Sequence, residues 1–193
     1  MIITLESCKN LTDNEIVARS LVNLDYFSCI YQRYESELLR YILRLTDLDE
    51  DEAHDILQES FIKIWRNLNE FDDSMKLSSW LYRIVHNETI SHIRKKKSFG
   101  KDNTRDVQLY RNILGEEPGM TDDPEEKVSR IPAILDQLPL KYKEILVLKF
   151  LELKSYDEIS DILKIPEGTV AIRINRAKQR YREVSGMNND NDK

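Results

Sequence analysis

The sequence is poor in glycine and proline, with five of each among 193 residues. Both residues favour turns and interrupt regular structure, so their scarcity argues against many short strands and favours long helices. Apolar residues also recur at three- and four-residue spacing, as in the series Leu57, Phe61, Ile64 and Leu68, which is the period of an amphipathic helix. We therefore expect an all-α fold.

Cysteine is scarce as well. Cys8 and Cys29 have neither the CxxC spacing of a zinc or redox site nor the density of a secreted disulfide scaffold. We expect both to be reduced thiols with a structural role.

Long hydrophobic runs and a secretory signal are also missing. No stretch of about 18 apolar residues is present, and the first residues do not combine a basic stretch, an apolar core and a cleavage site. We expect a cytoplasmic protein that does not insert into membranes. Its 40% apolar and 33% charged content suits a chain that folds around a core.

The net charge of -6 would argue against nucleic-acid binding if the charges were evenly spread. They are segregated instead. Residues 47–59 hold seven acids and no Lys or Arg, whereas Arg94 to Lys97 form an unbroken basic run. This distribution indicates separate faces or separate partners.

Between residues 98 and 130 the apolar periodicity fades, and glycine, proline and acidic residues gather. These features predict a flexible acidic linker. It divides the chain into two small helical domains, residues 11–97 and residues 131–184, followed by a disordered tail at residues 185–193. The spacing of apolar residues predicts helices over residues 13–22, 26–45, 52–68 and 78–97, and then over 140–151, 156–163 and 169–184.

The last two predicted helices have the pattern of a helix-turn-helix. Ser155 and Glu158 fit a capping box at the start of the first helix. Pro166 and Gly168 then interrupt the chain, and Thr169 is suited to cap the second helix. The second helix places one apolar stripe on a buried face, formed by Val170, Ile174, Ala177 and Tyr181.

The same helix is basic in an otherwise acidic protein, with five Lys or Arg and no acid between Thr169 and Arg182. Ile172 falls opposite the apolar stripe, where a thymine methyl group would give it an apolar contact. A solvated basic face is the alternative, but the cap, the break and both stripes agree on a helix that enters the major groove. For any single arginine we favour contact with phosphate over contact with a base edge. The candidate DNA-binding residues are Thr169, Ala171, Ile172, Arg173, Asn175, Arg176 and Arg180.

The N-terminal half carries a denser motif. Asp55-Ile-Leu-Gln58-Glu59-Ser-Phe61-Ile-Lys-Ile-Trp65 is followed by Phe71 and then by Trp80-Leu81-Tyr82-Arg83-Ile84-Val85-His86-Asn87. This pattern resembles region 2 of the extracytoplasmic-function group of bacterial sigma factors. The second domain resembles sigma region 4, on Leu138-Pro139, Tyr156 to Ile159, Gly168-Thr169-Val170, Arg173 and Arg176-Ala177. The resemblance covers roughly residues 13–183 apart from the linker.

The resemblance implies a protein that binds core RNA polymerase, recognises the -35 promoter element with region 4 and the -10 element with region 2, and helps to open the duplex. An inhibitory anti-sigma factor is a further partner that the family implies, although the sequence itself carries no sign of one. At two positions, Ser91 and Ile172, this chain departs from the residue that the family often has. The promoter sequence preference of other family members is therefore not transferable to this chain.

Region 2 supplies two further sets of candidate residues. One face of the helix over 52–68 combines polar groups with an aromatic, which suits a protein partner. The expected contacts to core polymerase are Asp55, Gln58, Ile62 and Trp65. The loop over 69–79 and one face of the next helix mix aromatic, amide and cationic groups, which suits unpaired DNA. The expected -10 contacts are Phe71, Lys76, Trp80, Arg83, Asn87, Ile90 and Arg94.

Three alternatives compete with this interpretation. A helix-turn-helix regulator that acts without joining polymerase would leave the motif of residues 55–65 unexplained, and a helical adaptor would bind protein only. A hydrolase or nuclease would need the acids of residues 47–59 to hold a metal, but they form one crowded run without a second cluster. We expect no metal, no other cofactor and no catalytic activity.

Overall fold

The computed structural model describes residues 8–99 and 130–186. Every regular element in these two ranges is helical, which confirms the all-α fold. The described ranges contain no helix long and apolar enough to cross a membrane. Most of the predicted linker, residues 98–130, and most of the predicted tail, residues 185–193, lie outside the described residues.

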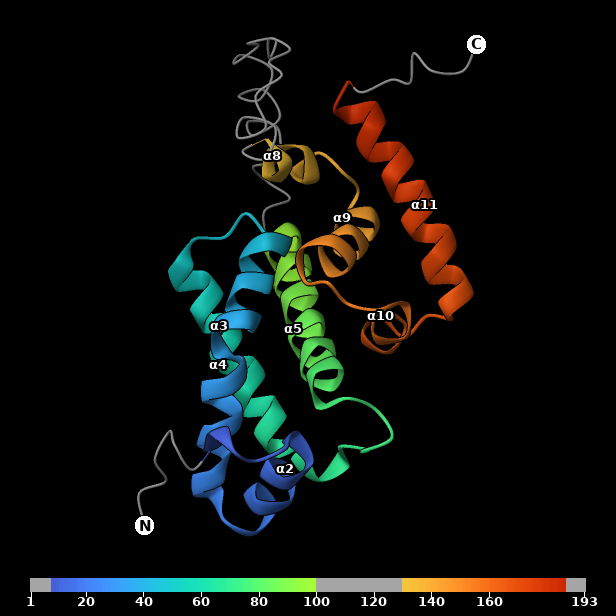
Figure 1. The fold of residues 1–193 in the computed structure, drawn as a ribbon. Helices are drawn as coiled ribbons and strands as arrows, with labels where there is room; N and C mark the ends of the chain where they lie inside the picture. Colours follow the sequence, from blue (N-terminus) through green and yellow to red (C-terminus); the bar gives the residue numbers. More distant parts are fainter. Residues whose placement is uncertain (1–7, 100–129, 187–193) are drawn as a thin grey trace.

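Residues 8–99 form the N-terminal unit (Figure 1), and its helix bounds follow the predicted ranges closely. Its elements are α2 (Asp13–Val22), η1 (Leu24–Tyr26), α3 (Phe27–Leu45), α4 (Glu50–Arg66), η2 (Leu68–Glu70) and α5 (Leu77–Phe99). Thr12 and Glu15 form a capping box that starts α2, and the Asp49 side chain accepts from the Glu52 backbone N–H to start α4. Helices α3, α4 and α5 pack together around a core that includes Leu38, Leu57 and Leu81.

Residues 130–186 form the C-terminal unit. Its elements are α8 (Ile131–Asp136), α9 (Leu140–Leu146), the π-helical turn η4 (Val147–Leu151), α10 (Tyr156–Leu163) and α11 (Glu167–Val184). The prediction missed α8, and the predicted helix over 140–151 changes to π-helical geometry at Val147. The predicted cap at Thr169 is wrong, because α11 begins two residues earlier behind Pro166, whose fixed φ suits a helix start without a side-chain cap.

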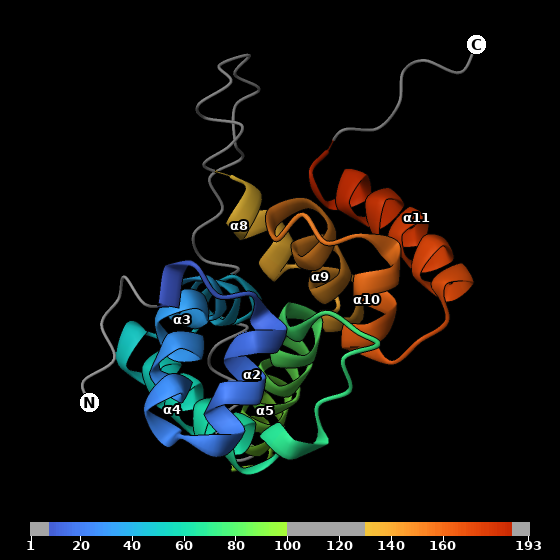
Figure 2. The same cartoon turned by 60° about the horizontal axis from the view of Figure 1, so that its bottom comes forward.

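The two units lie against each other. Helix α10 packs on α5, and η4 contacts α3, so that the C-terminal unit covers one side of the N-terminal unit (Figures 1 and 2).

The expectation for the two cysteines is wrong, because Cys8 and Cys29 form a disulfide with a Cα–Cα distance of 5.4 Å. The N-terminal segment folds back beside α3, where Arg33 donates to the backbone carbonyls of Cys8 and Leu11 at 2.8 Å each. A separation of 21 residues in sequence does not reveal this return of the chain.

Candidate nucleic-acid interface

Helices α10 and α11 form the predicted helix-turn-helix. The Ser155 N–H donates to Glu158 Oε2 at 2.7 Å and the Glu158 N–H donates to Ser155 Oγ at 3.2 Å, which confirms the capping box. Helix α10 ends at Leu163, and the next residue, Lys164, has the left-handed conformation with φ of 53°. The chain turns directly into α11, which begins at Glu167, so the turn needs few residues.

The buried and exposed sides of α11 separate as predicted. Val170, Ile174 and Ala177 are buried, and Tyr181 packs partly buried against the same core. Ile172 is 56% exposed although it is strongly apolar. Folding gives no reason for this exposure, so Ile172 belongs to a surface that is free to contact a partner. The exposed members of the candidate -35 set are Thr169, Ile172, Asn175, Arg176 and Arg180, and the half-buried ones are Ala171 and Arg173.

Two arginines of this surface already have acidic partners. Arg180 pairs with Glu183 one turn further along α11, at 2.7 Å. Arg173 donates from Nη1 to Glu144 Oε1 on α9 at 3.1 Å. Burial raises the pKa of Glu144, and the charge of Arg173 acts in the opposite direction. Arg176 is exposed, and no acidic side chain among residues 8–99 and 130–186 forms a salt bridge with it, so it is the better candidate for contact with phosphate.

The predicted -10 face of α5 is only partly exposed. Asn87 and Arg94 are exposed, and Arg83 is half-buried with its Nη2 3.6 Å from the Met75 sulfur. Trp80 and Ile90, by contrast, are only 5% and 8% exposed. The expectation of one open face is therefore wrong for this arrangement. A helical wheel places residues relative to their own helix and cannot show which other parts of the chain cover them.

The burial of Ile90 involves the C-terminal unit directly. A hollow between the units is lined by Ile90 of α5 together with Leu140, Leu163 and Ile165. Trp80 meets Phe71 edge-on, with ring centroids 5.6 Å apart, so the half-buried Phe71 is anchored at the base of its loop. Tyr82 is fully buried against Tyr41, as expected for a core residue. The base-stacking roles of Phe71 and Trp80 stay predictions.

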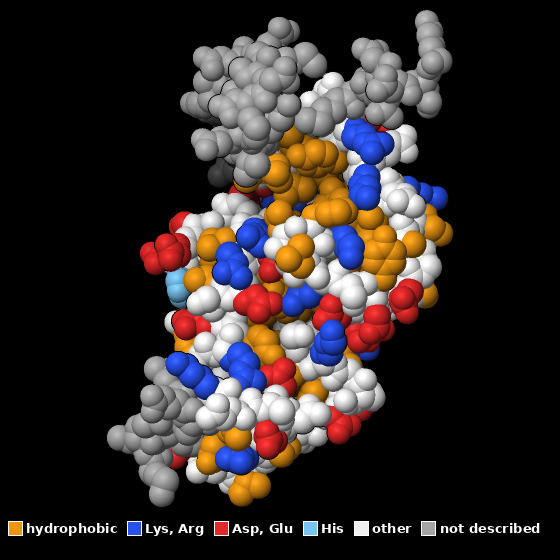
Figure 3. Space-filling model, viewed as in Figure 1, with side chains coloured by type: hydrophobic (Ala, Val, Ile, Leu, Met, Phe, Trp, Pro, Cys, Tyr) orange, Lys and Arg blue, Asp and Glu red, His pale blue; other side chains and the backbone are white. Residues whose placement is uncertain are grey.

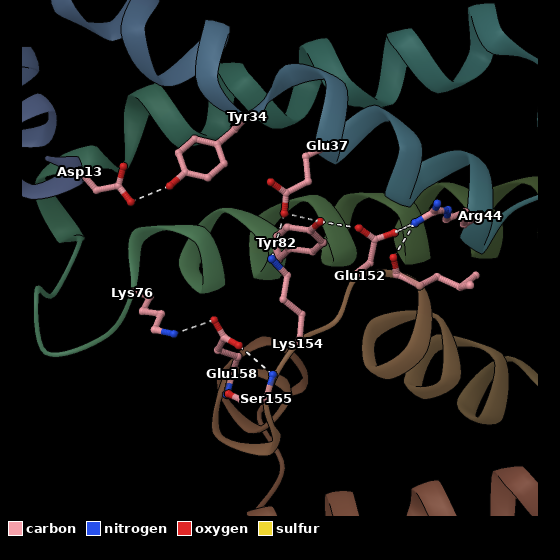
Figure 4. Close-up of polar contacts among 11 residues, drawn as sticks. Asp13, Tyr34, Glu37, Arg44, Lys76, Tyr82, Glu152, Lys154, Ser155 and Glu158 are labelled. Atoms are coloured by element: carbon pink, nitrogen blue, oxygen red, sulfur yellow. Dashed lines mark hydrogen bonds and ion pairs between the residues drawn. The ribbon is translucent and has the colours of Figure 1, made fainter. Parts of the chain in front are cut away.

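The loop before α5 also touches the helix-turn-helix. Lys76 is a predicted -10 contact, and its Nζ lies 3.0 Å from Glu158 Oε1 of α10 (Figure 4). Most of the Lys76 side chain remains exposed. Because the lysine end of this ion pair is open to solvent, its attraction is screened, and a phosphate can compete for Lys76.

The predicted polymerase-binding residues share an exposed face of α4. Asp55 and Gln58 are exposed, and the apolar Ile62 and Trp65 are 43% and 38% exposed. The adjacent face is buried as predicted, at Leu57, Ser60, Phe61 and Ile64 of α4 and at Leu68 of η2. Trp65 packs edge-on against Phe27 with ring centroids 5.3 Å apart. This contact holds the indole in place while leaving part of it free for a protein partner.

The C-terminal unit has an apolar surface that sequence reasoning missed. A hollow of about 340 Å³ lies between α8, η4 and α11, with Leu135, Phe150 and Tyr181 in its lining and Lys178 and Arg182 beside them. Figure 3 shows the apolar side chains gathered on this part of the surface. The lining comes from four elements, α8, α9, η4 and α11, so only the tertiary structure brings it together. A concave apolar surface with a basic edge suits a protein contact.

Sequence reasoning also missed a set of charged residues between the two units, namely Glu37, Arg44, Glu152 and Lys154. None of them stands in a recognisable motif. Lys154 is 7% exposed, which is unusual for lysine, and this burial becomes visible only in the folded chain.

Two family models match the chain in the expected order. Sigma-70 region 2 matches residues 30–99, and Sigma-70, region 4 matches residues 129–180. Among curated proteins, the ECF RNA polymerase sigma factor SigW of Bacillus subtilis is 36% identical over 170 residues, which cover 82% of this chain and 88% of SigW.

Solved structures support the same fold. CnrH in complex with the cytosolic domain of CnrY has a TM-score of 0.64 at 21% identity, covering 92% of this chain and 99% of CnrH. The sigma factor RpoE in complex with the anti-sigma factor NepR, from Bartonella quintana, has a TM-score of 0.60 at 24% identity, covering 84% of this chain and 98% of RpoE. The two family models and the similarity to SigW show that the chain belongs to the extracytoplasmic-function group of sigma-70 factors, the proteins that direct RNA polymerase to promoters.

Proposed function

We propose that the two units divide promoter recognition between them. In the polymerase complex, α11 contacts the -35 duplex, while the loop over residues 69–79 and the exposed face of α5 contact the -10 element as its strands separate. The exposed face of α11, with Ile172 and Arg176 opposite the buried stripe, is the observation that carries this proposal. It combines a group that suits a thymine methyl with a cation that suits phosphate.

The proposed contact with core polymerase is the face of α4 that carries Asp55, Gln58, Ile62 and Trp65. By family resemblance, its target is the clamp helices of the largest polymerase subunit. An exposed tryptophan beside an isoleucine, with polar groups around them, has the composition of a protein-binding hot spot. The apolar hollow around Phe150 supports a second protein contact, this time on the C-terminal unit.

The chain itself needs no catalytic group for this role. RNA synthesis belongs to the polymerase, and the sigma factor supplies binding energy and position. The same role places the protein in the cytoplasm, where the polymerase acts. An anti-sigma factor is a further proposed partner, since the structures of CnrH and RpoE were both solved with a bound protein, CnrY and NepR respectively.

Transcription with purified components tests the proposal. Overexpression followed by sequencing of the induced transcripts would first define the shared upstream elements. Purified core polymerase supplemented with this chain should then start transcription from these promoters, and core polymerase alone should not. If the chain neither binds core enzyme nor starts transcription with it, the proposed function fails.

The alternative is a helix-turn-helix regulator that never becomes a polymerase subunit. The match of residues 30–99 to sigma region 2 disfavours it, because such a regulator has no use for that domain. A gel shift separates the two. A regulator binds its duplex tightly by itself, whereas a sigma factor gains tight and specific binding only with core polymerase.

A further inference from the structure

The connection between η4 and α10 runs beside helix α5, and its side chains Glu152 and Lys154 point toward α5 and α3 of the N-terminal unit (Figure 4). Lys154 lies in this connection, and its Nζ donates to Glu37 Oε1 of α3 at 2.9 Å. The same ammonium group lies 4.0 Å from the centroid of the Tyr82 ring of α5. One lysine of the C-terminal unit therefore contacts two helices of the N-terminal unit through an ion pair and a cation–π interaction.

Glu152 makes a second set of contacts two residues earlier. Its Oε1 accepts from Arg44 Nη1 of α3 at 2.8 Å, and its Oε2 accepts from the Tyr82 hydroxyl at 2.7 Å. The side chain of Glu152 is only 2% exposed. Arg44 also donates to the backbone carbonyl of Leu151 at 2.8 Å, so it contacts both the side chain and the main chain of the connection.

Tyr82 stands between the two charged residues. Its hydroxyl lies within hydrogen-bond distance of Glu37 as well as of Glu152, at 2.8 and 2.7 Å. Burial and these two carboxylates raise the pKa of Tyr82, so the hydroxyl keeps its proton and remains a donor. The charges of Glu152 and Lys154 are thus matched by partners on the N-terminal unit, which is necessary because an unmatched buried charge is strongly destabilising.

The connection between η4 and α10 makes a sharp backbone turn at Leu153, between Glu152 and Lys154. Leu153 has φ of 55°, a conformation that is unfavourable for a residue with a branched apolar side chain, and it is 81% exposed. The turn at Leu153 leaves Glu152 and Lys154 on the side of the N-terminal unit while the leucine itself faces solvent. A strained turn of this kind persists only where the surrounding contacts hold it.

This docking covers residues that the proposed function needs. Ile90 is buried beside Leu140 and Leu163, Lys76 is paired with Glu158, and α10 packs along α5. The surface proposed for the -10 strand is therefore partly occupied by the C-terminal unit.

We propose that residues 151–154 are an intramolecular latch, which holds the free chain closed with α10 over α5 and must release before the -10 element is bound. The existence of the latch rests on the contacts above, whereas its consequence for the promoter rests on the proposed function. Docking of α10 on α5 and binding of the -10 element exclude each other. A -10 strand that binds only the open chain therefore shifts the population toward the open form.

Charge reversal tests the latch in the isolated full-length chain. Lys154→Glu places a carboxylate beside Glu37, and small-angle X-ray scattering should show a larger radius of gyration than in the unaltered chain. The double variant Glu37→Lys with Lys154→Glu exchanges the two charges and should restore at least half of the compaction. Lys63→Glu is the matched control, because Lys63 pairs with Glu88 inside the N-terminal unit.

A second measurement tests whether opening of the latch makes α5 accessible to single-stranded DNA. The probe is a fluorescent single-stranded DNA oligonucleotide of mixed sequence, and its binding is measured by anisotropy. Lys154→Glu should bind it about tenfold more tightly than Lys63→Glu, as expected if the closed form dominates the free chain. The comparison holds net charge constant, so a difference reports on conformation and not on general electrostatics.

Circular dichroism establishes that each variant is folded, and Glu152→Gln replaces Lys154→Glu if the latter does not fold. The latch is overturned if folded Lys154→Glu or Glu152→Gln scatters like the unaltered chain, or if the unaltered chain is already extended. Failure of the proposed function is seen separately, as a chain that opens on charge reversal but never starts transcription with core polymerase.

Discussion

Glu144 of α9 joins the helix proposed for -35 binding to the helix proposed for -10 binding. Its Oε1 accepts from Arg173 of α11 at 3.1 Å, and its Oε2 lies 3.7 Å from His86 Nε2 of α5. The other ring nitrogen of His86, Nδ1, is 2.8 Å from the Tyr41 hydroxyl. One buried carboxylate thus engages a candidate DNA-binding arginine and also contacts the N-terminal unit.

Glu144→Gln should increase the affinity of the chain for -35 duplex by about three- to tenfold at low salt, because it removes the negative charge that now neutralises Arg173. Fluorescence anisotropy over a range of salt concentrations measures this. The double variant Arg173→Ala with Glu144→Gln is the control and should lose the gain. A gain that persists without Arg173 would show that the carboxylate acts by another route.

Arg176→Ala should weaken binding to the -35 duplex by about five- to thirtyfold, because Arg176 is exposed on α11. The slope of log affinity against log salt concentration should also decrease by about the amount that one phosphate contact contributes. Binding to core polymerase should not change. Lys178→Ala removes the same charge from a side chain that lies over the Phe150 ring, and it should have a smaller effect on DNA. Equal loss of polymerase and DNA binding on Arg176→Ala would identify a structural residue.

Trp65→Ala should reduce the affinity for core polymerase by at least tenfold. A tryptophan that acts as a hot spot of a protein interface contributes about 2 kcal/mol or more to the binding free energy. Binding of the isolated chain to -35 duplex should stay the same. Val22→Ala shortens an apolar side chain that is 91% exposed on α2 and serves as the control. If polymerase binding survives Trp65→Ala in a folded protein, this face of α4 is not the contact.

The stability of the protein should fall as the pH is lowered from 6.5 to about 4. Burial and, to a lesser extent, the nearby charge of Arg94 together lower the pKa of His86 from 6.5 to about 4. The unfolded chain therefore binds a proton before the folded chain does, and the stability present above pH 6.5 is lost through this window, on the order of 3 kcal/mol.

Urea unfolding at several pH values measures this loss, and His86→Asn should remove it while keeping a polar group near Tyr41. Glu144 affects stability in the opposite direction, because burial raises its pKa and its protonation at low pH then favours the folded state. The difference between the unaltered chain and His86→Asn isolates the histidine. Parallel pH profiles for the two proteins would contradict the prediction.

Reduction of the Cys8–Cys29 disulfide should lower the free energy of unfolding by about 3 kcal/mol, since it releases a closed loop in the unfolded chain. Urea unfolding with and without dithiothreitol is the measurement. The double variant Cys8→Ser with Cys29→Ser should match the reduced protein and should not respond to dithiothreitol. Unchanged stability of the unaltered chain on full reduction would show that the hydrogen bonds of Arg33 suffice to hold the segment.

The sequence by itself determined the features that depend on neighbours within a few residues. The all-α class, the bounds of α2 and α10 and the capping box at Ser155 all follow from local spacing and local hydrogen bonds. The family was also identifiable from the motifs of residues 55–65 and 80–87, because both are dense and stand in the right order.

Only the tertiary structure decided which residues far apart in the sequence contact one another. Lys154 and Glu37 are 117 residues apart, and no local pattern marks either of them as a buried partner of the other. Ile90 falls on an outward face of α5, and in the folded chain it is buried beside Leu140 and Leu163 of the C-terminal unit. Cys8 reaches Cys29 because the segment before α2 returns along α3. Helix formation depends on neighbours along the chain, whereas docking and cross-links depend on surfaces that exist only after the helices have packed.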